Sequence, residues 1–187
     1  FDLDAGPVKI TMPNGGKRFM SMMAMNEDDY IYEVNYTPGN YTFSRSEVGT
    51  RYLFIGLRTL VDPADPKDIK EAQALQDAVK VSQKNPGKFE VPNWDTPSQK
   101  KVRESLTELG STIPDTKHMF GSRDQVDPVR HLIGSASAWG GIPEKETTYL
   151  NVVPVRNDGK TVHTLQVKDV PVDGFWSISV YNAQGYY

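Results

Sequence analysis

Cysteine is missing from the sequence, and so is any long apolar run. The 187 residues contain no Cys, which excludes cysteine nucleophiles, thiolate zinc sites, iron–sulfur clusters and disulfide frameworks. No stretch approaches the roughly 18 apolar residues of a membrane-spanning helix, so we expect a chain that does not span a membrane. Lys and Arg total 21 against 24 Asp and Glu, for a net charge of −3. This slightly acidic balance gives no electrostatic reason to bind nucleic acid.

The motifs of several common chemistries are also absent. The sequence has no G-x-S-x-G elbow, no G-x-x-x-x-G-K-[ST] loop, no G-x-G-x-x-G and no H-E-x-x-H. Its three histidines, His118, His131 and His163, do not stand at the spacing of metal ligands. We therefore expect no metal site and no cofactor, and the sequence leaves open whether the protein is an enzyme.

Alternating apolar and polar residues dominate the first sixty positions. Such alternation places every second side chain on one face of a β-strand, and it is clearest over residues 30–36. Turn-forming residues, including Gly and Pro, lie at 13–16 and 37–40. Strands are therefore predicted at residues 8–12, 18–25, 30–36, 41–43 and 51–60.

Four methionines lie close together in the second of these predicted strands. Alternation would place Met20 and Met22 on one face of the strand and Met23 and Met25 on the other. Thioethers are soft ligands that suit Cu(I), but a set divided between two faces makes a weak copper site. Because Met is a common and adaptable core residue, we interpret the four as core packing.

Three helices are predicted in the middle of the chain, at residues 66–82, 97–109 and 128–139. Each begins with a capping residue followed by Pro, as Asp65-Pro66, Thr96-Pro97 and Asp127-Pro128. The cap oxygen accepts a backbone N–H that has no partner in the helix, and Pro at the first helical position has no N–H to satisfy. Thr96 with Gln99 also matches a capping box.

After Pro143 the pattern returns to β. Strands are predicted at residues 149–155, 161–167 and 174–181, with a turn at Asn157-Asp158-Gly159 between the first two. Three strands are too few for a β-sandwich that is stable alone. We therefore expect this last part to be the incomplete beginning of a second β domain.

The order of strands, helices and strands indicates an α+β fold. We expect an N-terminal antiparallel β unit at residues 1–64, followed by a region of three helices packed on it at 65–142. The start of a second antiparallel β-sandwich is predicted at 143–187.

Several motifs resemble a known pair of domain families. The run from Val170 to Asn182, VPVDGFWSISVYN, looks like the opening of the domain of unknown function numbered 1214. Upstream stretches resemble its usual companion, numbered 1254, namely residues 48–52, 58–62, 92–95, 120–121, 126–129, 138–141, 153–154 and 157–159. The resemblance covers essentially the whole chain. It implies an exported, mostly bacterial protein, longer at both ends, with β-rich domains joined by a helical region and a periplasmic or secreted location.

Aromatic residues are concentrated in the second half of the chain. Clustered Trp and Tyr can line a cleft for a carbohydrate or an apolar ligand, but core packing is the commoner role of such residues and the favoured interpretation of Trp139 and Trp176. The resemblance supplies no catalytic residues. The candidate ligand-binding residues are Arg58, Trp94, Asp95, Trp139, Asp173, Trp176 and Tyr181.

Three functions stay open at this point. The leading hypothesis is a non-enzymatic protein of the cell envelope that binds a small molecule or a protein, because no catalytic motif is present. The second is a hydrolase of esters or polymers, whose candidate polar groups are Asp173, His163, Arg58 and Asp95. The third is a structural assembly subunit. Its unfinished second sheet would pair with another copy of the chain or with the C-terminal part expected to follow.

Overall fold

The structure, a computed structural model, describes residues 1–150 and 152–181. The backbone divides into two units, Phe1–Thr148 and Tyr149–Tyr187, and every helix and strand found in the described residues lies in the first. These elements are η1 (Leu3–Ala5), β1 (Val8–Met12), β2 (Met20–Asn26), β3 (Ile31–Asn35), β4 (Gly39–Phe43), α1 (Arg45–Val48), β5 (Leu53–Thr59), α2 (Pro66–Asp77), β6 (Lys80–Gln83), α3 (Thr96–Gly110) and α4 (Pro128–Ser137). They confirm the predicted α+β fold class.

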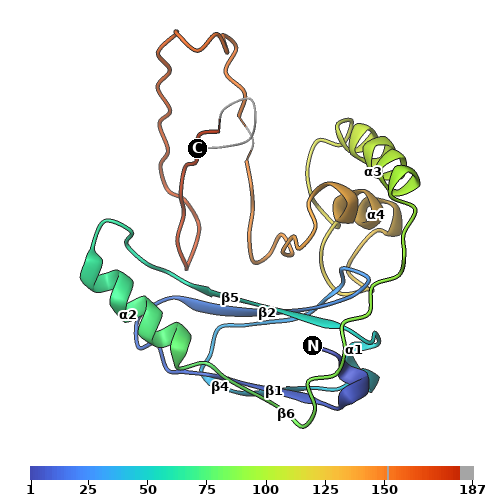
Figure 1. Cartoon of the computed structure of the whole chain (residues 1–187). Helices are drawn as coiled ribbons and strands as arrows, with labels where there is room; N and C mark the ends of the chain where they lie inside the picture. Colours follow the sequence, from blue (N-terminus) through green and yellow to red (C-terminus); the bar gives the residue numbers. More distant parts are fainter. Residues whose placement is uncertain (151, 182–187) are drawn as a thin grey trace. The chain divides into compact units, whose positions relative to one another are not determined.

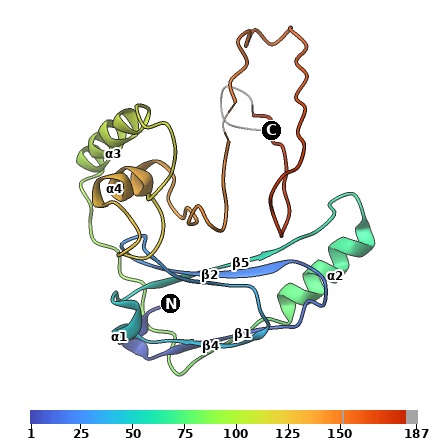
Figure 2. The same cartoon turned by 180° about the vertical axis from the view of Figure 1, so that it is seen from behind.

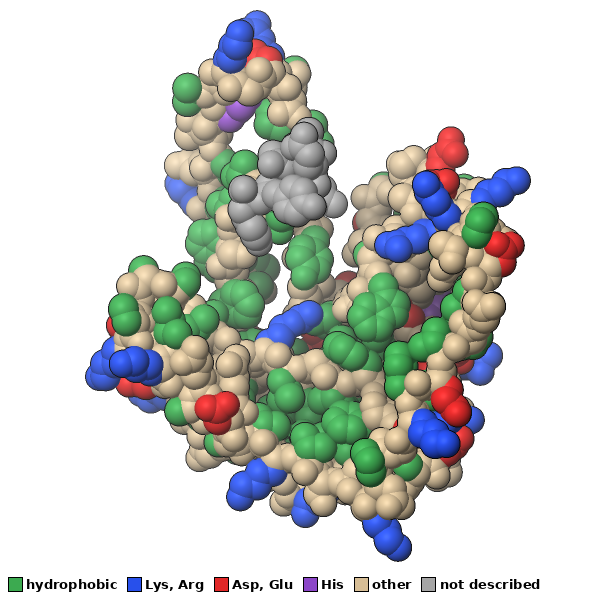
Figure 3. Space-filling view, viewed as in Figure 1, with side chains coloured by type: hydrophobic (Ala, Val, Ile, Leu, Met, Phe, Trp, Pro, Cys, Tyr) green, Lys and Arg blue, Asp and Glu red, His purple; other side chains and the backbone are tan. Residues whose placement is uncertain are grey.

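The strands of the first unit form two antiparallel sheets that share one core. One sheet has the order β4-β1-β6 and the other β3-β2-β5. Figures 1 and 2 show the sheets as two layers, and Figure 3 shows hydrophobic side chains in the gap between them. The buried residues of this core are Leu3, Val8, Ile10, Met12, Met20, Met22, Ala24, Phe43, Val48 and Leu53.

The chain changes sheet at both turns that the sequence predicts in the first sixty residues. Residues 13–16 lie between β1 and β2, and residues 37–40 lead from β3 into β4, so each connection joins strands of different sheets. By contrast, β2 and β3 follow one another in sequence and pair as a hairpin, whose turn spans residues 26–30.

Strand β2 is buried on both faces. Met20, Met22 and Ala24 lie in the core between the sheets, whereas Met23 and Met25 pack on the outer face of their sheet. The predicted division of the methionines and their packing role are thus confirmed. The outer face is covered in part by Ile142, which follows α4 and packs with Met23, Met25, Ile31 and Val34.

An ion pair between the buried Asp2 and the half-buried Arg51 holds the start of the chain in place. The carboxylate of Asp2 accepts hydrogen bonds from Nε and Nη2 of Arg51, both at 3.0 Å, and from the backbone N–H of Lys88 at 3.0 Å. The Arg51 guanidinium and these hydrogen bonds hold the pKa of Asp2 far below its ordinary value. Gly87 has a φ of +68°, and a Cβ there would lie 2.4 Å from Cβ of Asp2. The close approach of these segments therefore requires glycine at this position.

Helix α2 begins as predicted but ends early. Asp65 caps it by accepting a hydrogen bond from the backbone N–H of Lys67 at 2.8 Å. The predicted end at residue 82 is wrong, because the helix stops at Asp77 and residues 80–83 form strand β6. Val81 in β6 lies opposite Ile10 in β1. The helical spacing ends at Val79, and pairing with β1 makes residues 80–83 a strand.

Helices α3 and α4 form a layer with a small core of its own. Met119, Phe120 and Ile133 are buried there, with Leu106 and Ile113 packed against them. The predicted cap of α4 is confirmed, because Asp127 accepts hydrogen bonds from the backbone N–H groups of residues 129 and 130 at 3.0 and 2.9 Å.

Two helix ends differ from the prediction. The capping box at Thr96 is wrong, because Thr96 is already helical and Asp95 stands in the cap position. The reason is that the carbonyl of Asp95 accepts the first helical hydrogen bond, from the N–H of Gln99 at 2.9 Å. Helix α4 ends at Ser137 and not at residue 139, because Ala138 leaves the helical conformation with a φ of −147°.

The described residues of the second unit form no strand, so the strands predicted at 149–155, 161–167 and 174–181 are not present there. The turn at residues 157–159 is nevertheless built, because Asp158 accepts hydrogen bonds from the backbone N–H groups of Lys160 and Thr161 at 2.9 and 2.8 Å. Apolar side chains such as Val155 and Val162 are exposed. Alternation specifies which face a strand would bury, but a strand also needs a hydrogen-bonded neighbour and a covering layer.

Burial in the α3–α4 core should decide the effect of substitutions on two adjacent residues. Ile133 is 2% exposed and its neighbour Leu132 is 56% exposed. We expect Ile133→Ala to lower the free energy of unfolding by about 2–5 kcal/mol, and Leu132→Ala by no more than about 0.5 kcal/mol. Urea unfolding of both variants checks this, and similar losses would contradict the described packing.

The ion pair between Arg18 and Asp68 should make stability depend on pH in acid. The Arg18 guanidinium and the N–H of Asp62 lower the pKa of Asp68 from 3.8 to about 2. Between these two pH values the unfolded chain binds a proton that the folded chain does not, so the free energy of unfolding falls as the pH falls. Asp68→Asn should flatten this acid dependence.

Asp77→Asn is the matched control, because Asp77 also lies on α2 and makes no ion pair within residues 1–150 and 152–181. Circular dichroism of unfolding between about pH 2 and 4 compares the two variants with the unsubstituted chain. Equal acid dependence in the Asp68→Asn variant and the unsubstituted chain would contradict the assigned ion pair.

Candidate functional site

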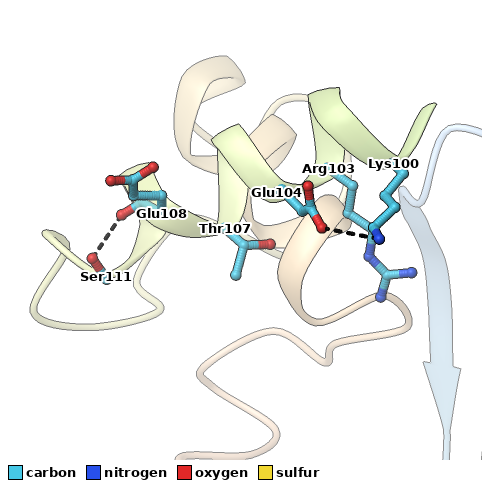
Figure 4. A pocket seen from close by; sticks show the side chains of 6 residues that line it. All are labelled: Lys100, Arg103, Glu104, Thr107, Glu108 and Ser111. Carbon is cyan, nitrogen blue, oxygen red and sulfur yellow. Dashed lines mark hydrogen bonds and ion pairs between the residues drawn. The ribbon is translucent and has the colours of Figure 1, made fainter. Parts of the chain in front are cut away.

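A hollow of about 600 Å³ lies along α3, lined by Lys100, Arg103, Glu104, Thr107, Glu108 and Ser111 (Figure 4). These residues form one stripe of a single helix. Four of these side chains already have partners: Lys100 pairs with Glu104 at 3.7 Å, Arg103 donates to the carbonyl of Ala136 at 3.1 Å, and the Ser111 hydroxyl donates to the carbonyl of Glu108 at 2.6 Å. We interpret this surface as the solvent face of the helix.

A pocket of about 440 Å³ lies at the turn of the β2–β3 hairpin. Three segments that are distant in sequence contribute to it, namely the hairpin, the end of α1 and the loop at residues 122–124. We call it the Tyr30 pocket. Its lining residues are Asn26, Asp28, Tyr30, Ile31, Tyr32, Val48, Gly49, Thr50, Ser122, Arg123 and Asp124.

Local hydrogen bonds shape the hairpin turn. The side-chain oxygen of Asn26 accepts from the backbone N–H groups of Asp28 and Tyr30, both at 3.0 Å. Asx side chains commonly stabilise turns in this way. Asp29 has a φ of +63°, a conformation that Asp tolerates better than most residues. The backbone N–H of Ile31 then donates to the carbonyl of Gly121 at 2.9 Å, which ties the hairpin to the 122–124 loop.

Asp29 is 3% exposed although it lies in a turn. Its Oδ1 accepts a hydrogen bond from the backbone N–H of Gly140 at 3.1 Å, so it joins the hairpin to the segment that follows α4. Its Oδ2 is buried and has no hydrogen-bond partner in the described part of the chain. A carboxylate oxygen left in this way is costly unless a positive charge lies nearby.

The ring of Tyr30 lies between two basic side chains. On one side it stacks on the ring of His131, with 4.3 Å between centroids and 14° between planes. On the other, the guanidinium carbon of Arg123 lies 5.7 Å from the Tyr30 centroid, a distance at which cation–π attraction operates. The stack connects the buried face of α4 to the wall of the pocket.

Charged groups of both signs line the Tyr30 pocket. The hydroxyl of Ser122 donates to Asp124 at 2.6 Å, and this hydrogen bond lowers the pKa of Asp124. Arg123 and Asp28 have no ion pair or side-chain hydrogen bond to any described residue, and they do not pair with one another. Burial raises the pKa of Tyr32, which keeps its phenol protonated.

The residues predicted from sequence lie elsewhere. Arg58 and Trp139 are on the outer side of the β3-β2-β5 sheet, where Trp139 meets the ring of Phe54 edge-on at 5.4 Å. Arg58 acts electrostatically on Tyr36, but burial and the hydrogen bond that Tyr36 donates to Glu146 prevail and raise the pKa of Tyr36 to about 12.

Trp94 and Asp95 are exposed at the start of α3, and Asp95 makes no side-chain capping bond. Asp173, Trp176 and Tyr181 belong to the second unit. The interpretation of Trp139 and Trp176 as core residues is wrong, because 61% and 55% of these residues is exposed. The physical reason is local: Trp139 follows the end of α4, and Trp176 lies in a unit whose described residues form no sheet.

Within each unit, no hydrogen bond or ion pair joins the described polar groups that were proposed for a hydrolase. Arg58 and Asp95 belong to the first unit, and no hydrogen bond or ion pair joins them. Asp173 and His163 belong to the second, where the His163 ring contacts the carbonyl of Arg156 at 2.8 Å and not Asp173.

Sequence reasoning missed Tyr30, Arg123 and His131. The contact between the His131 ring and the carbonyl of Asp28 spans 103 residues of chain, and no spacing rule reaches that far. The one local signal was the polar run at residues 26–29, which is typical of a turn.

Two further kinds of site have no candidate in the described residues. Within residues 1–150 and 152–181, no group of three or more His, Asp or Glu side chains is arranged to hold a metal ion. None of the helices in the described part of the chain is both long and apolar enough to cross a bilayer.

Comparison with known proteins supports the fold. The chain is similar to the crystal structure of the VPA0106 protein from Vibrio parahaemolyticus, a structural-genomics target, with a TM-score of 0.58 and 16% sequence identity. The match covers 78% of this chain and 56% of the Vibrio protein. No family model and no curated protein matches the chain. At this identity the likeness concerns the fold alone.

Proposed function

We propose that the chain is a binding module that takes a small dipolar ligand, one with an anionic and a cationic group, into the Tyr30 pocket. The observation that carries the proposal is that Arg123 and Asp28 line the same pocket without pairing with each other. Opposite charges held apart in this way remain available to a ligand that has both. The pocket volume of about 440 Å³ falls within the range usual for small-ligand sites.

Arg123 is suited to hold the anionic group. A guanidinium presents a planar fork of N–H donors that matches a carboxylate in two parallel hydrogen bonds. Its position over the ring of Tyr30 restricts the side chain before a ligand arrives, and this reduces the entropy lost on binding. Asp28, on the hairpin turn, supplies the acceptor for the cationic group.

Titration of the full chain with glycine, acetate and ethylamine tests the proposal. Glycine carries both charges, and the other two carry one each. Changes in amide chemical shift around residues 26–31 and 122–124 report binding. We expect glycine to bind more tightly than acetate or ethylamine. Arg123→Gln should weaken glycine binding about tenfold or more, because a hydrogen bond to a charged group contributes roughly 1.5–3 kcal/mol.

Two further variants make this test specific. Asp28→Asn should weaken glycine binding but leave acetate binding unchanged, since acetate has no cationic group. Arg156→Gln is the matched control, because it makes the same change in the second unit, outside the pocket. No shift at the pocket amides with any probe, or equal affinity for glycine in the Arg123→Gln variant and the unsubstituted chain, would overturn the proposal.

We propose further that the chain belongs to the paired families of unknown function numbered 1254 and 1214, and that it acts in the cell envelope. The motif at residues 170–182 and the upstream stretches that resemble these families support this assignment. Fractionation of cells that express the protein from its own gene should recover it from the periplasm or the medium. Recovery with the cytoplasmic fraction would contradict the assignment to the envelope.

A further inference from the structure

His131 makes an unusual pair of contacts. It is 6% exposed on α4. Its Nδ1 lies 2.8 Å from the carbonyl oxygen of Met119, and its Nε2 lies 2.9 Å from the carbonyl oxygen of Asp28. A carbonyl oxygen can only accept, so each of these hydrogen bonds needs a proton on the ring nitrogen. A neutral imidazole carries one N–H and the imidazolium carries two.

These two hydrogen bonds join separate parts of the first unit. Met119 belongs to the core of the α3–α4 layer, and Asp28 belongs to the turn of the β2–β3 hairpin. The His131 ring also forms the floor on which Tyr30 stacks, and Tyr30 in turn lies under Arg123. The position of the pocket wall therefore depends on the ring of His131.

We infer that His131 is a positioning residue for the Tyr30 pocket, and that it holds the hairpin turn in place with both of its hydrogen bonds only while it is protonated. The consequence for ligand binding rests on the proposed function, whereas the consequence for the turn does not. When the ring loses its second proton, one nitrogen presents a lone pair to a carbonyl oxygen, and that contact becomes repulsive.

Charges on the neighbouring elements bear on this protonation. Asp29 has a buried carboxylate with one oxygen that has no hydrogen-bond partner in the described part of the chain. It is the next residue after Asp28, whose carbonyl accepts from Nε2 of His131. Arg123 lies over the ring of Tyr30, which stacks on His131. The other ionisable groups on the elements around His131 are Glu27, Asp28, Tyr30, Lys117, His118, Asp124, Asp127 and Arg130.

Binding at the pocket should therefore weaken as the pH rises. Loss of either hydrogen bond breaks the connection from Met119 through His131 to Asp28, so the turn that carries Asp28 and Tyr30 is held less firmly. We expect the affinity for glycine to fall about threefold to tenfold across the titration of His131, the range that corresponds to one ordinary hydrogen bond. In the His131→Gln variant, the affinity should no longer change over this range.

The decisive experiment follows the ring nitrogens of the full, isotope-labelled chain by NMR between about pH 5 and 8, the range in which imidazoles titrate. His131 is assigned by through-bond correlation of its ring with its own backbone. We expect both ring nitrogens to be protonated at the acidic end, and the amide signals of Asp28 and Tyr30 to move with the same midpoint as the ring. His118→Gln is the control, because His118 lies outside the stack.

Two results would overturn the inference: amide signals of the turn that stay constant while His131 titrates, or one neutral form of the ring at every pH. Neither result requires a variant, so the test stands even if His131→Gln does not fold. If glycine fails to bind at any pH while the turn follows His131, the proposed function fails and the positioning role stands. If glycine binds with the same affinity across the titration of His131, the proposed effect of His131 protonation on ligand affinity is contradicted.

Discussion

The burial of β2 on both faces is the constraint on which the rest of the first unit depends. One face of this strand contributes Met20, Met22 and Ala24 to the core between the sheets. The other face presents Met23 and Met25, which would meet water unless a further layer covered them. The segment after α4 supplies part of that cover through Ile142. Covering β2 thus brings Gly121, His131, Gly140 and Ile142 close to the β2–β3 hairpin.

The Tyr30 pocket is a consequence of this arrangement. The hairpin turn lies where β2 leaves the sheet, and three contacts fasten it to the outer layer: Asp29 to Gly140, Ile31 to Gly121 and Asp28 to His131. Because these contacts fix the turn, Tyr30 and Asp28 keep their positions next to Arg123 without a ligand. Preorganisation of this kind reduces the entropic cost of binding, which is why a pocket built from a short turn can serve as a ligand site.

The features that the sequence predicts correctly are local. Alternation and one continuous apolar run located β1 to β5, and the Asp-Pro pairs located the starts of α2 and α4, because a cap depends on residues within one helical turn. Strand β6 was missed because the helical spacing that ends at Val79 was extended to residue 82, and only the pairing of Val81 with Ile10 makes a strand there. The site could not be predicted, since the contact between Asp28 and His131 depends on how distant elements pack. The strands predicted after residue 148 are absent from the described residues, because a strand also depends on a neighbouring strand that local alternation does not supply.

Native-state amide hydrogen exchange measures most directly whether the turn is fixed before any ligand binds. The informative amides are those of Ile31 and Gly140, which donate to Gly121 and Asp29. We predict that these two amides exchange about as slowly as those in the middle of β2, because opening them requires the outer layer to separate from the sheet. Exchange at the rate of an exposed loop would contradict a preformed pocket.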